Sequence, residues 1–253
     1  MNFDKTSNPT LSENIIKNFA FAATDRTMTV QGTITKIALL LALVIAGAVF
    51  TWTKVMNGLE TGAVSVNGWM IGGSVAGFVL AMVISFKQEW APFLSPVYAV
   101  CEGLFVGTIS AYFEAMYPGL VMRAVLLTFS VLFALLFLYK TQLVKVTQRF
   151  RSILMGATMG IALAYLIPFI IRLFGVNMSF MFGGGSLGII VSVVVVAIAA
   201  LNLVLDFDFI EQGSQSGLPA YFEWYGAFGL MVTLVWLYIE ILRLLAIVAG
   251  RRD

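Results

Sequence analysis

The side chains that could carry chemistry in this sequence lie within its apolar segments, where charged groups are unusual. Asp206 and Asp208 follow Asn202 near the end of one apolar run. Glu240 and Arg243 lie inside the next run. A charged residue at the centre of a membrane-spanning helix costs roughly 2.5–3.5 kcal/mol even on a lenient insertion scale. We therefore expect these side chains to pair with one another or to bind a proton or a cation.

Asp206 and Glu240 together suggest a proton-controlled cation path. They lie on consecutive, antiparallel helices, so the facing sides of these helices could bring the two carboxylates together. Two carboxylates in one poorly solvated site cannot both ionise cheaply, and they would share a proton. Carboxylate oxygens are also ligands that Ca²⁺ prefers, so the pair is a candidate calcium site. The chain has no histidine, so we expect any response to pH near neutrality to come from such acids.

A purely structural role is the alternative for each of these groups. Arg243 follows Glu240 by three residues, which is close enough for an ion pair within one helix. Asn202 lies one turn before Asp206 and shares its face. Asp208 lies about 200° round the helix from Asp206, so we expect it to point toward the loop or the lipid headgroups. Asp208 is nevertheless a rival to Asp206 for pairing with Glu240.

The elements that must position these groups are membrane-spanning helices. Of the 253 residues, 60% are hydrophobic and 11% are charged, whereas soluble domains carry about 25% charged residues. The mean hydropathy is +0.96. Seven apolar runs are each long enough to cross a bilayer. The sequence therefore predicts an all-α integral membrane protein with seven transmembrane helices, at about residues 35–55, 68–86, 91–113, 122–139, 153–173, 187–209 and 224–248.

The chain is predicted to have a polar arm over residues 1–33 and a single transmembrane domain over residues 34–253. Thr10 and Glu13 have capping-box spacing, so the arm either contains a short interfacial helix or is a disordered tail. Segments on the side of the N-terminus hold nine Lys and Arg, against three in the first three opposite loops. This places the N-terminus in the cytoplasm. Arg251 and Arg252 would then lie outside after a seventh crossing, so the side of the C-terminus stays open.

Three glycine pairs have the small-xxx-small spacing that allows helices to approach closely in lipid. They are Gly73–Gly77, Gly103–Gly107 and Gly156–Gly160, and each indicates helix packing or, alternatively, a flexible gate. Without histidine, and with Cys101 as the single cysteine, the chain lacks the usual nucleophile–histidine pairs and metal-ligand clusters. We expect neither an enzyme nor a bound cofactor.

The order of short motifs along the chain resembles that of the Bax inhibitor (transmembrane Bax inhibitor motif) family. The third apolar segment contains Glu102-Gly103-Leu104, the sixth ends with Asp206 and Ile210, and the seventh contains a Leu-Tyr-hydrophobic-acid segment. The polar start resembles a bacterial branch of the family. The quoted stretches are Asn8-Pro9, Met28–Val30, Pro96–Gly107, Ala124, Thr128, Asp206–Ile210 and Leu237–Glu240.

The resemblance implies six helices around a central seventh, in the inner membrane of a bacterium. It also implies a pH-sensitive calcium leak governed by an acid pair, carried over here as Asp206 and Glu240. This sequence has Glu240 where channel-type members have Asp, and it has no Arg between Trp69 and Phe86, where some members have one.

Three functions remain open. The first is a pH-sensitive calcium or cation leak, in which Ca²⁺ is the transported ion. The second is a proton-coupled solute transporter that uses Glu102 as part of a relay. Glu102 lies near the middle of the third apolar segment with no cation close in sequence. The third is a membrane protein that modulates a protease or a stress response through a protein partner, without transport. We expect contacts with the lipid bilayer, and none with nucleic acid.

Overall fold

The computed structural model describes residues 26–61, 66–173 and 186–251. Within these ranges the chain forms seven long helices and one 3₁₀ turn, η2 (Gln88–Trp90), before α4. All seven helices are long and apolar enough to cross a membrane, which confirms the all-α membrane fold. The long helices are α2 (Val30–Thr61), α3 (Val66–Phe86), α4 (Ala91–Met116), α5 (Leu120–Lys140), α6 (Gln148–Leu173), α7 (Ser186–Gln215) and α8 (Phe222–Ala249).

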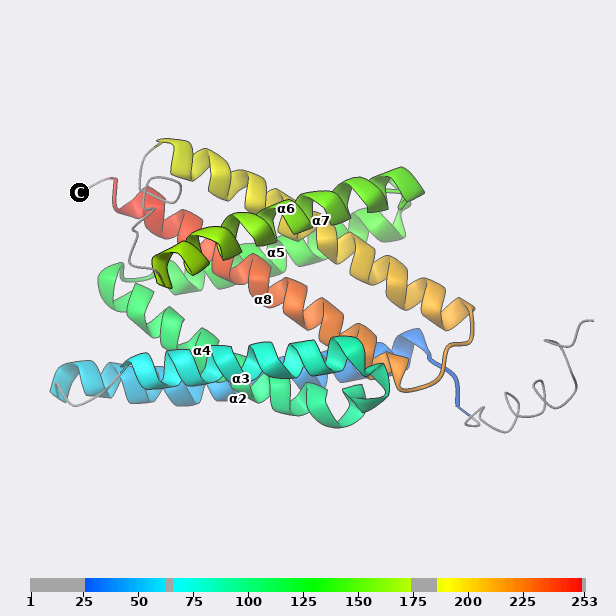
Figure 1. The fold of residues 1–253 in the computed structure, drawn as a ribbon, viewed down its shortest axis with the longest axis horizontal. Coiled ribbons are helices and arrows are strands. Elements are labelled where there is room, and N and C mark those ends of the chain that lie inside the picture. The colour runs from blue at the N-terminus through cyan, green and yellow to red at the C-terminus, as the bar shows by residue number, and fades with distance from the viewer. Residues whose placement is uncertain (1–25, 62–65, 174–185, 252–253) are drawn as a thin grey trace, which may run out of the picture.

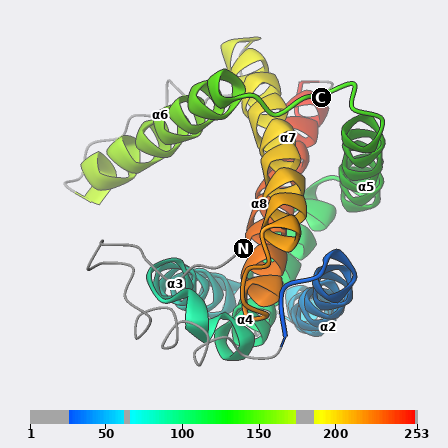
Figure 2. The same cartoon turned by 90° about the vertical axis from the view of Figure 1, so that its right-hand side faces the viewer.

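Helix α8 runs through the middle of the bundle (Figures 1 and 2) and contacts α2, α4, α5 and α7. Its sequence is apolar nearly all round, which is the pattern of a helix buried on every side. Leu230, Met231, Leu234, Leu237 and Leu242 are each at most 4% exposed. The predicted central seventh helix is therefore confirmed.

The two outer helices are α3 and α6, and Figure 2 shows them on separate sides of an open flank. Helix α3 packs mainly on α4, and α6 packs mainly on α7. The six helices around α8 therefore do not form a closed ring in the described part of the chain.

Close packing of α2 against α4 depends on glycine. A side chain at Gly103 or Gly107 would collide with backbone atoms of α2, including those of Ala48. A side chain at Gly73 would likewise meet the backbone of α4, so both of these predicted packing pairs are confirmed. The packing interpretation is wrong for Gly156–Gly160 among the described residues, because none of their atoms lies within 4 Å of a Cβ placed at either glycine. These glycines lie on a face of α6 that the bundle leaves uncovered.

The predicted domain boundary falls close to the start of α2. Residues 1–25, including the proposed interfacial helix, lie outside the described residues, and α2 begins at Val30. The division into an arm and a single domain stays a prediction.

Candidate functional site

A cleft of about 690 Å³ lies between α7 and α8, close to the turn that joins them. Ser85 of α3 and Arg151 of α6 line it as well, so four helices contribute to its walls. Its acidic side chain is Asp206. The other lining residues include Gly213, Gly226, Gly229 and Thr233.

Asp206 comes close to α8 because α8 has a glycine at the crossing. A Cβ placed on Gly229 would lie 3.8 Å from Asp206 Oδ1. Thr233, one turn further along α8, donates its hydroxyl to the Gly229 carbonyl at 3.2 Å. The Asp206 Oδ2 atom is buried, and no hydrogen-bond partner for it exists among the described residues. A buried carboxylate oxygen without a partner is costly to keep ionised, so this atom favours a proton or a cation as its missing partner.

Asp208 is engaged in a partly buried ion pair with α6, and the expectation that it points toward the loop or the headgroups stays a prediction. Its Oδ2 atom lies 2.8 Å from Nη2 of Arg151 on α6 and accepts a hydrogen bond of 2.8 Å from Gln212 Nε2. Asp208 is 7% exposed. The acid two residues after Asp206 is therefore already neutralised by a cation from another helix.

Glu240 is tied to two neighbours. Arg243 Nη2 lies 2.9 Å from Glu240 Oε2, which is the ion pair within one helix that the spacing suggested. The Tyr165 hydroxyl of α6 donates a hydrogen bond of 2.8 Å to Oε1. The Arg243 guanidinium also lies 5.3 Å from the centre of the Tyr165 ring. Sequence reasoning missed Tyr165, because nothing in its own surroundings indicates a partner 75 residues later in the chain.

The structure does not bring Asp206 and Glu240 together. Asp206 meets α8 at Gly229 and Thr233, and Glu240 lies seven residues beyond Thr233. At a rise of 1.5 Å per residue, this puts Glu240 about 10 Å further along the axis of α8. The predicted carboxylate pair is therefore corrected to two separate sites, and Asp206 itself forms no ion pair with any described residue.

Asn202 and Glu102 lie apart from the cleft. The Asn202 amide donates to Thr158 Oγ1 of α6 at 2.9 Å and to the Ile198 carbonyl at 2.8 Å, so it fastens α6 to α7. The Glu102 carboxylate of α4 lies against Gly77 of α3, where an added Cβ would be 2.9 Å from Oε2. No group of three or more His, Cys, Asp or Glu side chains is placed to hold a metal ion in the described residues.

Seven membrane-length helices, of which α8 is buried at the centre of the bundle, define a multi-pass helical membrane protein. A family model described as "Bax inhibitor 1 like" matches residues 8–250, and the chain belongs to this family. No curated protein and no solved structure gave a match.

Proposed function

We propose that this protein is a pH-sensitive calcium leak of the cell membrane in which Asp206 is the acid that the ion meets. The observation that supports it is the buried Asp206 Oδ2 atom, which has no partner among the described residues and belongs to a side chain that lines a cleft of about 690 Å³. Calcium prefers oxygen ligands, and an uncompensated carboxylate attracts it. Family membership favours the same function by analogy.

The charges around the cleft support a route for cations past Asp206. Arg151 and Tyr225 are the other charged or titratable side chains among the lining residues described. The positive charge of Arg151 is held by Asp208 at 2.8 Å, and it is therefore largely neutralised. Asp206 then remains as the uncompensated charge of the cleft.

The direction of the pH response follows from the charge of Asp206. An ionised Asp206 attracts a cation, and a protonated one does not. We therefore propose that flux falls as the pH falls and the acid takes up its proton. Glu240, which was predicted to pair with Asp206, has no part in this switch, because Arg243 neutralises its charge.

The orientation that we propose places the N-terminus and the mouth of the cleft in the cytoplasm. Ser85, which lines the cleft, is followed closely by Lys87, and Arg151 lies in the same wall. Basic residues favour the cytoplasmic side. On this proposal the protein is not an enzyme, it needs no cofactor, and Ca²⁺ and protons are its ligands.

Replacing Asp206 with asparagine should lower calcium flux by about tenfold and abolish its pH dependence, because the amide keeps the shape but loses the charge. The measurement is calcium entry into liposomes that contain purified protein, from about pH 5 to pH 8. Glu211→Gln is the matched control, since Glu211 lies on the same helix in an exposed position and accepts a hydrogen bond from Tyr139.

The outcomes separate the proposal from its rivals. Equal flux in the wild type and in Asp206→Asn would contradict the role of Asp206. A wild-type protein that is silent in liposomes would favour a protein that acts through a membrane partner. Flux of a solute that saturates and requires a proton gradient would favour a proton-coupled transporter.

A further inference from the structure

Residues 26–29, just before α2, run antiparallel to the turn between α7 and α8. The Met28 amide donates to the Leu218 carbonyl at 2.7 Å, and the Ala220 amide donates to the Arg26 carbonyl at 3.2 Å. Thr27 lies opposite Pro219 between these two hydrogen bonds. The start of the described chain is therefore attached by two backbone hydrogen bonds to the turn beside the cleft.

Met28 fills the space between α7 and α8 at this end. It is 1% exposed. Its thioether occupies the position next to Gly213 of α7, where an added Cβ would lie 2.9 Å from the sulfur. Its methyl group would lie 3.5 Å from a Cβ on Gly226 of α8. Both glycines line the Asp206 cleft, and neither has a side chain that could fill the space if Met28 moved away.

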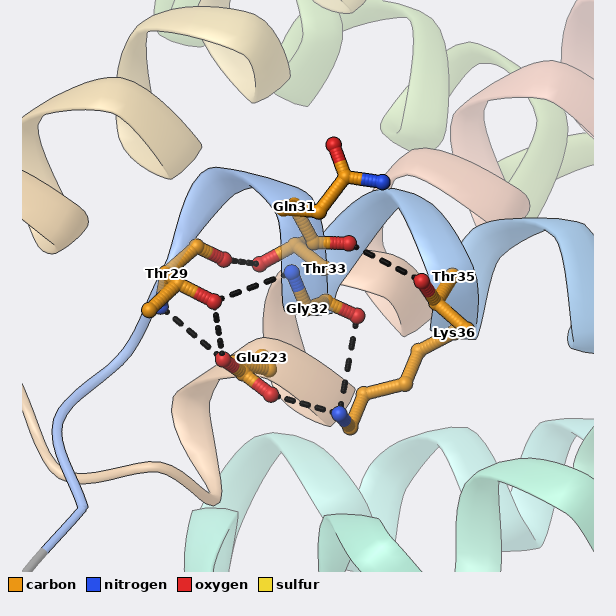
Figure 3. Close-up of polar contacts among 7 residues, drawn as sticks. All are labelled: Thr29, Gln31, Gly32, Thr33, Thr35, Lys36 and Glu223. Atoms are coloured by element: carbon orange, nitrogen blue, oxygen red, sulfur yellow. Dashed lines mark hydrogen bonds and ion pairs between the residues drawn. The ribbon is translucent and has the colours of Figure 1, made fainter.

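Glu223 at the start of α8 anchors this segment (Figure 3). Its Oε1 atom accepts hydrogen bonds from the Thr29 amide at 2.9 Å and from the Thr29 hydroxyl at 2.8 Å. Its Oε2 atom accepts one from Lys36 Nζ at 2.5 Å. A Cβ at Gly32 would collide with the Glu223 carboxylate, so a larger residue there would displace the carboxylate from this position. Glu223 is 8% exposed, so these charged hydrogen bonds are partly shielded from water.

We propose that residues 26–29 are a removable clasp that closes the loop end of the Asp206 cleft, with Met28 as its plug and Glu223 as its anchor. The contacts that hold the clasp are confined to this end of the bundle, so the clasp can open while the seven helices stay packed. A methionine suits this role, because its flexible side chain can both fill an irregularly shaped space and move out of it. The effect of the clasp on ion flux rests on the function proposed above, but its opening does not.

The opening is measured with a cysteine placed under the plug. Ile210 is 6% exposed, and its Cγ1 atom would lie 3.2 Å from a Cβ on Gly226, beside Met28. We use Ile210→Cys in a Cys101→Ser background and follow its reaction with a water-soluble thiol reagent. Adding Glu223→Gln weakens the anchor, so we expect the reaction rate to rise by about tenfold.

Glu114→Gln is the matched control for this experiment. Glu114 also accepts two hydrogen bonds, from the amides of Gly119 and Val121, but it lies near the end of α4, where its carboxylate caps the start of α5. We expect this variant to leave the reaction rate of Ile210→Cys unchanged. Equal rates in the Glu223→Gln and Glu114→Gln proteins would overturn the clasp, provided that both proteins elute as folded material.

A reversible cross-link provides the second test. Thr27 and Pro219 face each other as a pair without mutual hydrogen bonds, so their Cα atoms are expected about 4.5 Å apart. Disulfides span about 4.4–6.8 Å between Cα atoms, so Thr27→Cys with Pro219→Cys in the Cys101→Ser background should form one. We expect oxidation to lower calcium flux by about tenfold, to the level of a closed cleft, and a reductant to restore it.

Failure of the clasp and failure of the proposed function give different results in these experiments. Equal flux before and after reduction, in a protein whose parent conducts calcium, would overturn the clasp as a gate. If the parent does not conduct, or if Asp206→Asn conducts like the wild type, the proposed function fails while the cysteine reaction still decides whether the clasp opens.

Discussion

Leucine in place of Gly103 should destabilise the protein by about 3 kcal/mol or more, at the upper end of the cost of overpacked sites. The reason is that a Cβ added to Gly103 on α4 would collide with backbone atoms of Val44 and Gly47 on α2. A flexible side chain could turn away from the new leucine, but a helix backbone cannot. Since the α2–α4 contact is also the most extensive between any two helices described, separating them affects the whole bundle.

The measurement is the midpoint of thermal unfolding of the purified protein in detergent. A loss of 3 kcal/mol corresponds to a decrease of about 6–12 °C in Tm for a chain of this size. Gly156→Leu on α6 is the matched control, because no described atom lies within 4 Å of its added Cβ. Its Tm should stay close to that of the wild type. Equal Tm values for the two variants would contradict the close packing of α2 on α4.

Replacing Arg243 with methionine should cost about 3–5 kcal/mol, since it leaves the carboxylate of Glu240 without the cation at 2.9 Å. Glu240 is 5% exposed, so water cannot take over from the guanidinium. The double variant Glu240→Leu, Arg243→Met should recover most of this loss, because it removes the buried charge together with its partner. About 1 kcal/mol should remain lost, since the double variant also gives up the hydrogen bond from Tyr165.

Thermal unfolding of the wild type, the two single variants and the double variant measures this coupling. A double variant no more stable than Arg243→Met would show that the ion pair does not carry the effect. A large coupling free energy between Glu240 and Arg243 would show that Glu240 stabilises the packing of α8. Asp206 would then be the acid available for ions.

Much of the fold could be predicted, because the signals for it are local. A run of about 20 apolar residues specifies a membrane-spanning helix wherever it occurs, and all seven such runs became helices. The ion pair between Glu240 and Arg243 is equally local, since a spacing of three residues on one helix brings the two side chains together. The partners of Asp208 and Glu240 on α6 could not be predicted, since Arg151 and Tyr165 reach them only through the packing of distant helices.

The prediction that Asp206 pairs with Glu240 is wrong because of the register of the α7–α8 hairpin. In a helical hairpin, residues at equal distances from the turn face each other, because both helices rise by the same amount per residue. Asp206 lies nine residues before Gln215, the end of α7, whereas Glu240 lies eighteen residues after Phe222, the start of α8. The hairpin register therefore separates them, and the motif resemblance alone did not contain this information.

The clasp at Glu223 also fixes an order of events during synthesis. The Thr29 amide and the carboxylate that holds it are 194 residues apart in the chain. The N-terminal segment leaves the ribosome long before its anchor is made, since chains emerge from the N-terminus onward. The loop end of the cleft can thus close only after the start of α8, which carries Glu223, has been translated. A chain that is truncated before α8 lacks Glu223, so its N-terminal segment has no anchor.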